Sequence, residues 1–353
     1  MPANPIPLTL ITGFLGSGKT TLLNRLIAAP GVGAPAVIVN EFGEVGVDND
    51  LIRGASGDIL TIEDGCVCCS VRGDLVEAMT GLLVERAAGT VPAFDRVFVE
   101  TTGIADPAGI IDMVVSSPAL AGRFAIANVV ATVDALNGLA AFEEFDEAVR
   151  QVAVADCLVV TKCDLAGGEP AGLRDRLGAL NPTAAVVRGD DASAATTALI
   201  PGAGPAAPTV RAAELLARVA AAGDLGHDHR HDAAADHAHD IGTYCVRDDE
   251  PVPLDTLQLF LDTVGRDAGA DLLRVKGIVN VAERPGRPAV IHAARAYAHA
   301  IEWLPAWPGD DRQSRIVFIA RGGRPERFAD TWSLVRRFAA GPALPRPEVL
   351  PAP

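Results

Sequence analysis

Two short stretches of the chain hold the residue types that could do chemistry. The first is "GFLGSGKT" (13–20), which fits the spacing G-x-x-x-x-G-K-[ST] and lies between an apolar run and an apolar helical pattern. Glycines in such a turn let backbone N–H groups converge on phosphate oxygens at a helix N-terminus. A lysine there reaches the β- and γ-phosphates, and the next hydroxyl ligates Mg²⁺. The nucleotide contacts predicted here are Gly13, Gly16, Ser17, Gly18, Lys19, Thr20 and Thr21.

The second stretch is "GCVCCS", which places three of the chain's six cysteines at positions 66, 68 and 69. Thiolates favour Zn²⁺ or a similar ion such as Co²⁺ over Mg²⁺. Three of them leave a tetrahedral site one ligand short, as suits an exchangeable metal, and Glu41 is the leading candidate for the fourth. Two alternatives stay open. Cys66 and Cys69 have the C-x-x-C spacing of redox motifs, and all three thiols could be structural.

The stretch "VVTKCDL" (159–165) bears on which base is bound. The Asp164 carboxylate would accept both donors on the Watson–Crick edge of guanine, whereas adenine presents an acceptor there and leaves the carboxylate unpaired. The alkyl stem of Lys162 would lie over the ring. The pattern is similar to the N-K-x-D element of GTPases, with Thr161 in place of Asn. Guanine is therefore the predicted base, and GTP and GDP the predicted nucleotides.

A further stretch, "RVFVETTGIADP" (96–107), closes a strand with an acidic residue. Glu100 at that place would hold Mg²⁺ through water, beside Thr20. Gly103 resembles the glycine whose amide senses the γ-phosphate in GTPase switch loops. We predict that Lys19, Thr20, Glu100 and Gly103 form the catalytic group.

The elements that must position these residues follow from hydrophobic periodicity. Six β-branched runs (8–12, 36–40, 58–62, 96–100, 127–133 and 157–161) alternate with helical patterns. This is typical of an α/β, doubly wound, mostly parallel sheet of the P-loop NTPase type. The pattern restarts after residue 240 as a smaller α+β C-terminal domain with an antiparallel sheet. The predicted domains are 1–205 and 241–345, joined by a helix and a histidine-rich linker over 206–240.

The linker histidines form a separate candidate site. Neutral imidazoles bind metal ions, and the interspersed aspartates raise the local cation concentration. The alternative is a solvated linker that only happens to contain histidines. The accessory metal ligands predicted in this way are His227, His229, His231, His237 and His239.

Composition excludes several classes of partner. The 353 residues carry 30 Lys and Arg against 45 Asp and Glu, a net charge of −15. Such an acidic chain has no general attraction to nucleic acid or to anionic membranes. We see no signal-peptide pattern, no apolar run of membrane-spanning length and no disulfide framework, so we expect a cytoplasmic protein.

Taken together, the motifs resemble those of CobW-family GTPases, in the same order along nearly the whole chain. The stretches that carry the resemblance are "GFLGSGKTTLLN", "VNEFGEVGVDNDLI", "GCVCCSVRGDL", "ETTGIADP", "VADCLVVTKCDL" and "LLRVKGIVNV". The resemblance implies a GTP-hydrolysing metallochaperone that binds Zn²⁺ or Co²⁺ at Cys66, Cys68 and Cys69 and delivers it to a client metalloprotein. The client and the oligomeric state do not follow from the sequence.

Three alternatives to this function stay open. One is a regulatory GTP-binding protein with structural zinc. Another is a cobalt or iron insertion factor for cobalamin synthesis or nitrile hydratase. The third is a P-loop kinase or ATPase, against which "TKCD" argues. Because we find no arginine finger and no positioned glutamine, slow intrinsic GTP turnover is expected.

Overall fold

The computed structural model describes residues 5–30, 32–40, 60–63, 71–191, 217–219, 241–294, 297–298, 301–307, 310–322, 326–340 and 349–351. Contacts divide the chain into two compact units, residues 1–174 with 185–205 and residues 175–184 with 206–353. No helix in the described part is long and apolar enough to cross a membrane.

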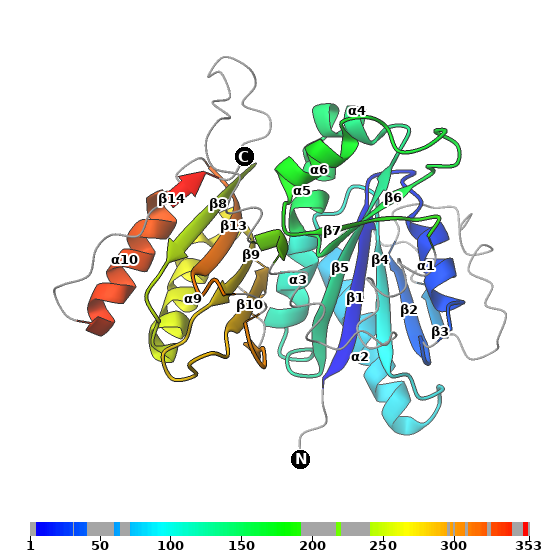
Figure 1. Ribbon diagram of the computed structural model, residues 1–353. Coiled ribbons are helices and arrows are strands. Elements are labelled where there is room, and N and C mark those ends of the chain that lie inside the picture. Colours follow the sequence, from blue (N-terminus) through cyan, green and yellow to red (C-terminus); the bar gives the residue numbers. More distant parts are fainter. Residues whose placement is uncertain are drawn as a thin grey trace. The chain divides into compact units, whose positions relative to one another are not determined.

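The first unit is a parallel sheet with helices on both faces (Figure 1). Seven described strands are ordered β3-β2-β4-β1-β5-β6-β7, and every pairing between them is parallel. The strands are β1 (Ile6–Gly13), β2 (Pro35–Asn40), β3 (Leu60–Glu63), β4 (Arg96–Thr101), β5 (Phe124–Asp134), β6 (Cys157–Thr161) and β7 (Ala185–Arg188). The predicted α/β fold is confirmed.

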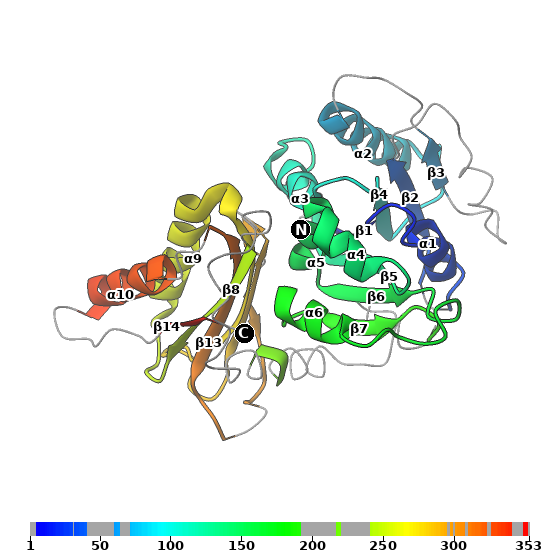
Figure 2. The ribbon, with the colours of Figure 1, turned by 90° about the horizontal axis from the view of Figure 1, so that it is seen from above.

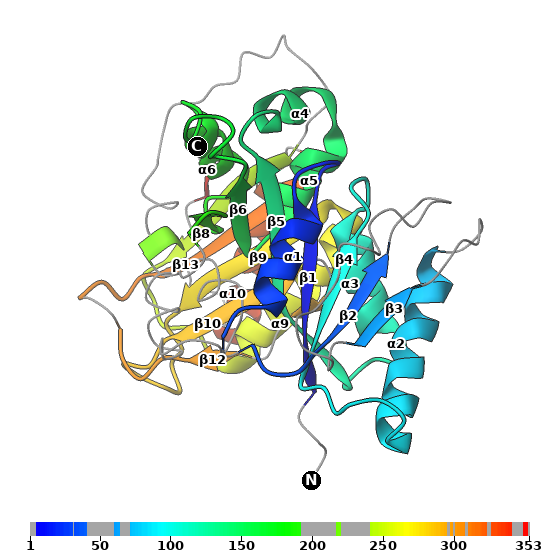
Figure 3. The ribbon, with the colours of Figure 1, turned by 90° about the vertical axis from the view of Figure 1, so that its right-hand side faces the viewer.

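Helix α1 packs on one face of this sheet, and α3 and α5 cover the other (Figure 2). Leu22, Leu23 and Leu26 of α1 are buried against a group that includes Ile11 and Phe98. The helices of this unit are α1 (Lys19–Ile27), α2 (Val71–Ala88), α3 (Pro107–Ser116), α4 (Gly138–Glu144) and α5 (Asp146–Val154), and α6 (Leu173–Leu180) spans the boundary between the units. Because all strands are parallel, their carboxyl ends meet at one edge, where α1 begins (Figure 3).

The second unit is built on an antiparallel sheet ordered β11-β10-β9-β13-β8-β14, with β12 paired to β10. Its helices α9 (Leu254–Ala268) and α10 (Glu326–Ala340) lie on one face of this sheet, and η2 (Gly269–Asp271) follows α9. The strands are β8 (Ile241–Asp248), β9 (Leu272–Val279), β10 (Ala289–Ala294), β11 (Tyr297–Ala298), β12 (Glu302–Trp303), β13 (Ser314–Arg321) and β14 (Val349–Pro351). This α+β unit was also predicted.

The structure bears on three details of the sequence prediction. The strand expected at 58–62 is described as Leu60–Glu63, and strand β7 was not predicted. β7 is short, and its residues are intermediate or exposed, so it lacks a continuous buried run. Of the helix expected near 210–223, only residues 217–219 lie in the described part, and they are helical.

Candidate nucleotide site

The turn after β1 has the geometry of a phosphate-binding loop. Gly13 ends the strand, residues 14–18 form the turn, and Lys19, Thr20 and Thr21 open α1. Gly18 is the N-cap of α1 with φ 90°, a left-handed conformation that favours glycine. The N–H groups of the first turn of α1 therefore point toward the loop, where phosphate oxygens are bound favourably.

Lys19 is a buried side chain of this loop, with 7% of its surface exposed. Its ammonium nitrogen lies 3.5 Å from the Phe14 carbonyl oxygen. Thr21, by contrast, is exposed on α1. Lys19, and not Thr21, therefore has its side chain held against the phosphate-binding loop.

Ser17 was predicted to contact the nucleotide, but its side chain is turned into the protein. It is 2% exposed, and its hydroxyl oxygen lies 2.6 Å from that of Thr132 on β5. The Ser17 carbonyl accepts a hydrogen bond of 2.7 Å from the Thr161 hydroxyl at the end of β6. The Ser17 side chain thus fixes the loop to the sheet, which leaves only its backbone to face phosphate.

Thr20 and Glu100 meet across the sheet edge, at the start of α1 and near the end of β4. The Thr20 hydroxyl donates a hydrogen bond of 2.7 Å to Glu100 Oε1, and Glu100 is fully buried. A hydroxyl and a carboxylate are oxygen donors of the kind that Mg²⁺ takes beside a nucleotide. The two residues therefore fit the donor set of a magnesium ion.

Gly103 lies directly against the phosphate loop. A Cβ atom added to it would fall 2.7 Å from both the Cα and the backbone nitrogen of Leu15, and real Cβ atoms do not approach other atoms so closely. Only glycine fits there. The Gly103 loop, which was predicted to sense the γ-phosphate, thus packs on the phosphate-binding loop that contains Leu15.

The segment after β6 carries the two residues assigned to the base. Lys162 has φ 57° and is the only described non-glycine residue with a positive φ. Its ammonium donates a hydrogen bond of 2.6 Å to Asp134 Oδ2 at the end of β5. Asp164 is exposed. The Gly189 amide, after β7, donates to the Val160 carbonyl at 2.8 Å, so the loop after β7 borders the same segment.

Asp134 is the anchor of this segment. Burial alone would raise its pKa, but hydrogen bonds from Lys162, the Leu136 amide (2.7 Å) and Asn137 (3.1 Å) hold the pKa below its usual value. The carboxylate is therefore charged at neutral pH, and it restrains both Lys162 and the start of α4.

Three residues of the site were not predicted from the sequence. They are Asp134, Thr161 as a brace of the phosphate loop, and a buried glutamine, Gln151, whose amide reaches the loop that contains Gly103. The first two close strands that were predicted, so their place at the carboxyl edge was available as a signal. Gln151 gave no signal, because a single polar residue in an amphipathic helix is usually solvent-exposed.

The remaining candidate metal ligands lie outside the described residues: Glu41, Cys66, Cys68, Cys69, His227, His229, His231, His237 and His239. No group of three or more potential metal ligands occurs within the described ranges. Cys157, Cys163 and Cys245 are buried free thiols. Burial raises the pKa of Cys163, which keeps this neighbour of the base segment protonated at neutral pH.

Fold and site together define a P-loop nucleoside triphosphate-binding protein. Two family models match the chain: "CobW/HypB/UreG, nucleotide-binding domain" over residues 7–188 and "Cobalamin synthesis protein cobW C-terminal domain" over residues 241–334. The chain belongs to the CobW family of P-loop GTPases. The resemblance noted from the motifs is thereby confirmed.

Individual relatives span most of the chain. A protein named zinc chaperone YjiA, from Escherichia coli K12, is 33% identical over 90% of this chain and 94% of its own length. A protein named zinc chaperone CobW, from a Sinorhizobium species, is 30% identical over 89% of this chain and 92% of its own. The solved structure of Zn(II)-bound YjiA GTPase has a TM-score of 0.60 and 27% identity, and covers 94% of this chain and 99% of that one.

Proposed function

We propose that the protein is a GTP-hydrolysing metallochaperone that carries Zn²⁺, or Co²⁺, to a client metalloprotein. The supporting observation is one sheet edge that joins a phosphate loop, the Thr20–Glu100 pair and the Lys162 segment. Two relatives that align over most of this chain are named zinc chaperones. The carried ion is cargo, whereas Mg²⁺ is part of the nucleotide site.

Each residue of the edge has a defined task in this proposal. Lys19 and the first N–H groups of α1 bind the phosphates, and Thr20 with Glu100 holds Mg²⁺. Mg²⁺, when bound, neutralises charge that develops on the phosphates during hydrolysis. The backbone of Gly103 faces the γ-phosphate. Lys162 and Asp164 select guanine, with Asp134 holding the lysine in place.

The cargo site of the proposal consists of Cys66, Cys68 and Cys69, with Glu41 as the fourth ligand. Glu41 follows β2 directly, so it comes from the chain segment that leaves the nucleotide edge of the sheet. If γ-phosphate contacts order that segment, the nucleotide state changes the ligand set of the metal. By reciprocity, the metal must then change GTP affinity by the same factor.

Metal titration tests the proposal. Reduced protein is titrated with Co²⁺ and with Zn²⁺ in Mg²⁺ with a non-hydrolysable GTP analogue, or with GDP, while thiolate–cobalt absorption is followed. Tight binding that depends on the nucleotide and is lost in Cys68→Ser supports a metal-delivering GTPase. Equal affinity in both nucleotide states would contradict the coupling and favour the regulatory GTP-binding protein with structural zinc.

Two further measurements separate a metal-delivering GTPase from an ATPase and from an insertion factor. Competition of GTP against ATP for the purified protein distinguishes a GTPase from a kinase or ATPase. Selectivity for cobalt or iron over zinc in the titration would favour an insertion factor for cobalamin synthesis or nitrile hydratase. A cytoplasmic location and the absence of nucleic-acid and membrane partners stay predictions from the composition.

A further inference from the structure

Gln151, in the middle of α5, holds the loop between β4 and α3. Its amide nitrogen donates hydrogen bonds to the carbonyl oxygens of Gly103 (3.0 Å) and Ala105 (3.2 Å). The side chain is 1% exposed. Because both loop atoms are acceptors, the –NH₂ group of Gln151 must be the part of the amide that faces them.

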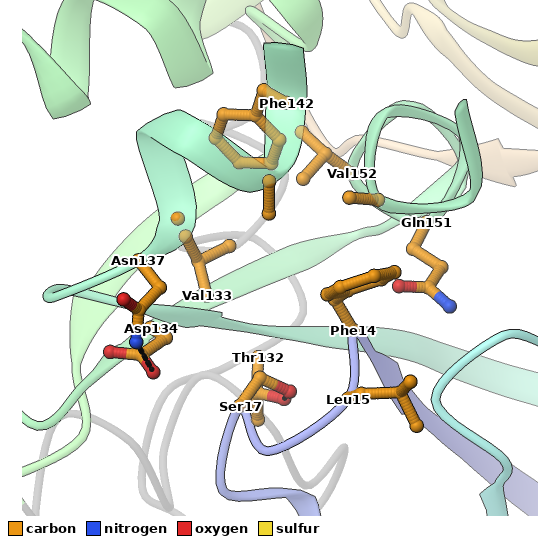
Figure 4. Close-up of a pocket in the computed structure, with 13 residues that line it drawn as sticks. Phe14, Leu15, Ser17, Thr132, Val133, Asp134, Asn137, Phe142, Gln151 and Val152 are labelled. Carbon is orange, nitrogen blue, oxygen red and sulfur yellow. Dashed lines mark hydrogen bonds between the residues drawn. The ribbon is translucent and has the colours of Figure 1, made fainter. Parts of the chain in front are cut away.

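The oxygen of the same amide group is in a less favourable position than the nitrogen. Among the described residues, Gln151 Oε1 is buried without a hydrogen-bond partner. Gln151 lines a largely apolar pocket, part of it open to solvent, together with Phe14, Leu15, Phe142 and Val152. Figure 4 shows the oxygen on the Phe14 side and the nitrogen turned away. A buried acceptor without a partner costs free energy, so packing alone does not explain a glutamine here.

The loop is fixed from several directions. Gly103 rests on the Leu15 backbone, and Gln151 binds the loop through two carbonyl oxygens. At the far end, Asp106 caps α3 by accepting a hydrogen bond from the Ala108 amide at 3.0 Å. The two peptide groups that Gln151 contacts therefore have defined orientations before any phosphate arrives.

We propose that Gln151 is a positioning residue for GTP hydrolysis, which holds the Gly103 loop in the orientation that meets the γ-phosphate. It acts through the backbone and does not touch the reacting atoms. The inference rests on the proposed GTPase activity. Since GDP lacks the γ-phosphate, the contribution of Gln151 belongs to the triphosphate state, where a preorganised loop favours both binding of the γ-phosphate and its hydrolysis.

The test compares Gln151→Met with wild type. Methionine keeps the length of the side chain and loses both hydrogen-bond donors. We expect kcat for GTP to fall about tenfold, because a loop that is held less firmly is displaced from the orientation that meets the γ-phosphate. The preference for a non-hydrolysable GTP analogue over GDP should fall by a similar factor. Affinity for GDP should stay within about twofold of wild type, because the loop faces only the γ-phosphate.

Gln313→Met, in the second unit, is the matched control. Gln313 donates one hydrogen bond of 2.7 Å to Asp249, and its loss should leave nucleotide kinetics unchanged. Wild-type turnover is measured first: if wild type does not hydrolyse GTP, the proposed function fails and not the role of Gln151. A variant that melts at a lower temperature but keeps wild-type kcat and analogue preference would overturn the proposal.

A measurement on wild type covers the case in which the variant does not fold. Hydrogen exchange of the peptide spanning 101–106 is followed without nucleotide. The proposal expects protection in that state already, because the loop is held before GTP binds. Exchange at the rate of an unstructured segment would overturn it.

Discussion

The carboxyl edge of the parallel sheet and the helix-covered face of the antiparallel sheet bury different kinds of side chain. At the carboxyl edge of the parallel sheet, buried polar groups point at one another and at the phosphate loop, as Glu100, Thr132 and Gln151 do. In the second unit, the core between the sheet and its helices is largely aromatic and aliphatic. Burial therefore orients a site in the first unit, whereas it supplies stability in the second.

The largest expected effect is a loss of stability that is confined to the second unit. Trp332 on α10 is fully buried, with its ring 4.7 Å from Phe260 and its Nε1–H donating to Asp248 at 2.9 Å. Trp332→Ala should cost about 3–5 kcal/mol of unfolding free energy, measured by denaturant titration. The milder Trp332→Phe loses mainly the hydrogen bond, about 1 kcal/mol. If GTP affinity also fell in Trp332→Ala, the separation between a nucleotide-binding first unit and a stabilising second unit would be contradicted.

The next largest effect is expected on the rate of GTP hydrolysis rather than on the stability of the protein. In Gly103→Ala, the added methyl group has no room against the Leu15 backbone, so the loop must shift. We expect kcat for GTP to drop by about a hundredfold, with little change in GDP affinity. Gly81→Ala in α2 is the matched control, because a Cβ there meets no atom within 4 Å. Comparable losses in both variants would mean that the close contact is irrelevant.

A smaller effect is expected at the junction of phosphate loop and base segment. The Thr161 hydroxyl reaches the carbonyl oxygens of Ser17 (2.7 Å) and Val133 (3.2 Å), and Thr161→Val removes it with little change in shape. Loss of such a bond costs about 1 kcal/mol, so GTP and GDP should both bind about fivefold more weakly by calorimetry. A loss confined to GTP would place Thr161 with the γ-phosphate loop instead.

The smallest effect is a predicted insensitivity to pH. Because the pKa of Asp134 is lowered in the folded protein, its pairing with Lys162 is present above the ordinary aspartate range and is lost only as pH falls through the lowered value. The ratio of wild-type to Asp134→Asn affinity for GDP should therefore change less than about twofold from about pH 8 to about pH 5, because the second ionisation of the terminal phosphate, near about pH 6, affects both proteins alike. The Asp134→Asn variant should bind GDP more weakly throughout this range. A midpoint above about pH 4 in that ratio would contradict this assignment.

Much of the molecule was predictable because its signals are local. Strand β1, the phosphate loop and α1 follow one another within 22 residues, and each has its own pattern. Contacts between distant segments are different. Thr161 and Ser17 are 144 positions apart, and Gln151 and Gly103 are 48 apart. A single sequence holds no periodicity that pairs them. The predicted ligands Cys66, Cys68 and Cys69 stay predictions, outside the described residues.

The loop that Gln151 holds also offers a place for a reporter. Ile104 lies between the two carbonyl groups that are held, yet half of its own surface, 52%, is exposed. A small environment-sensitive fluorophore introduced there as an unnatural amino acid would sit on a fixed backbone and look outward. Its emission would show in real time whether the segment stays fixed or moves as the γ-phosphate arrives and departs, during single turnovers and without a label on the nucleotide.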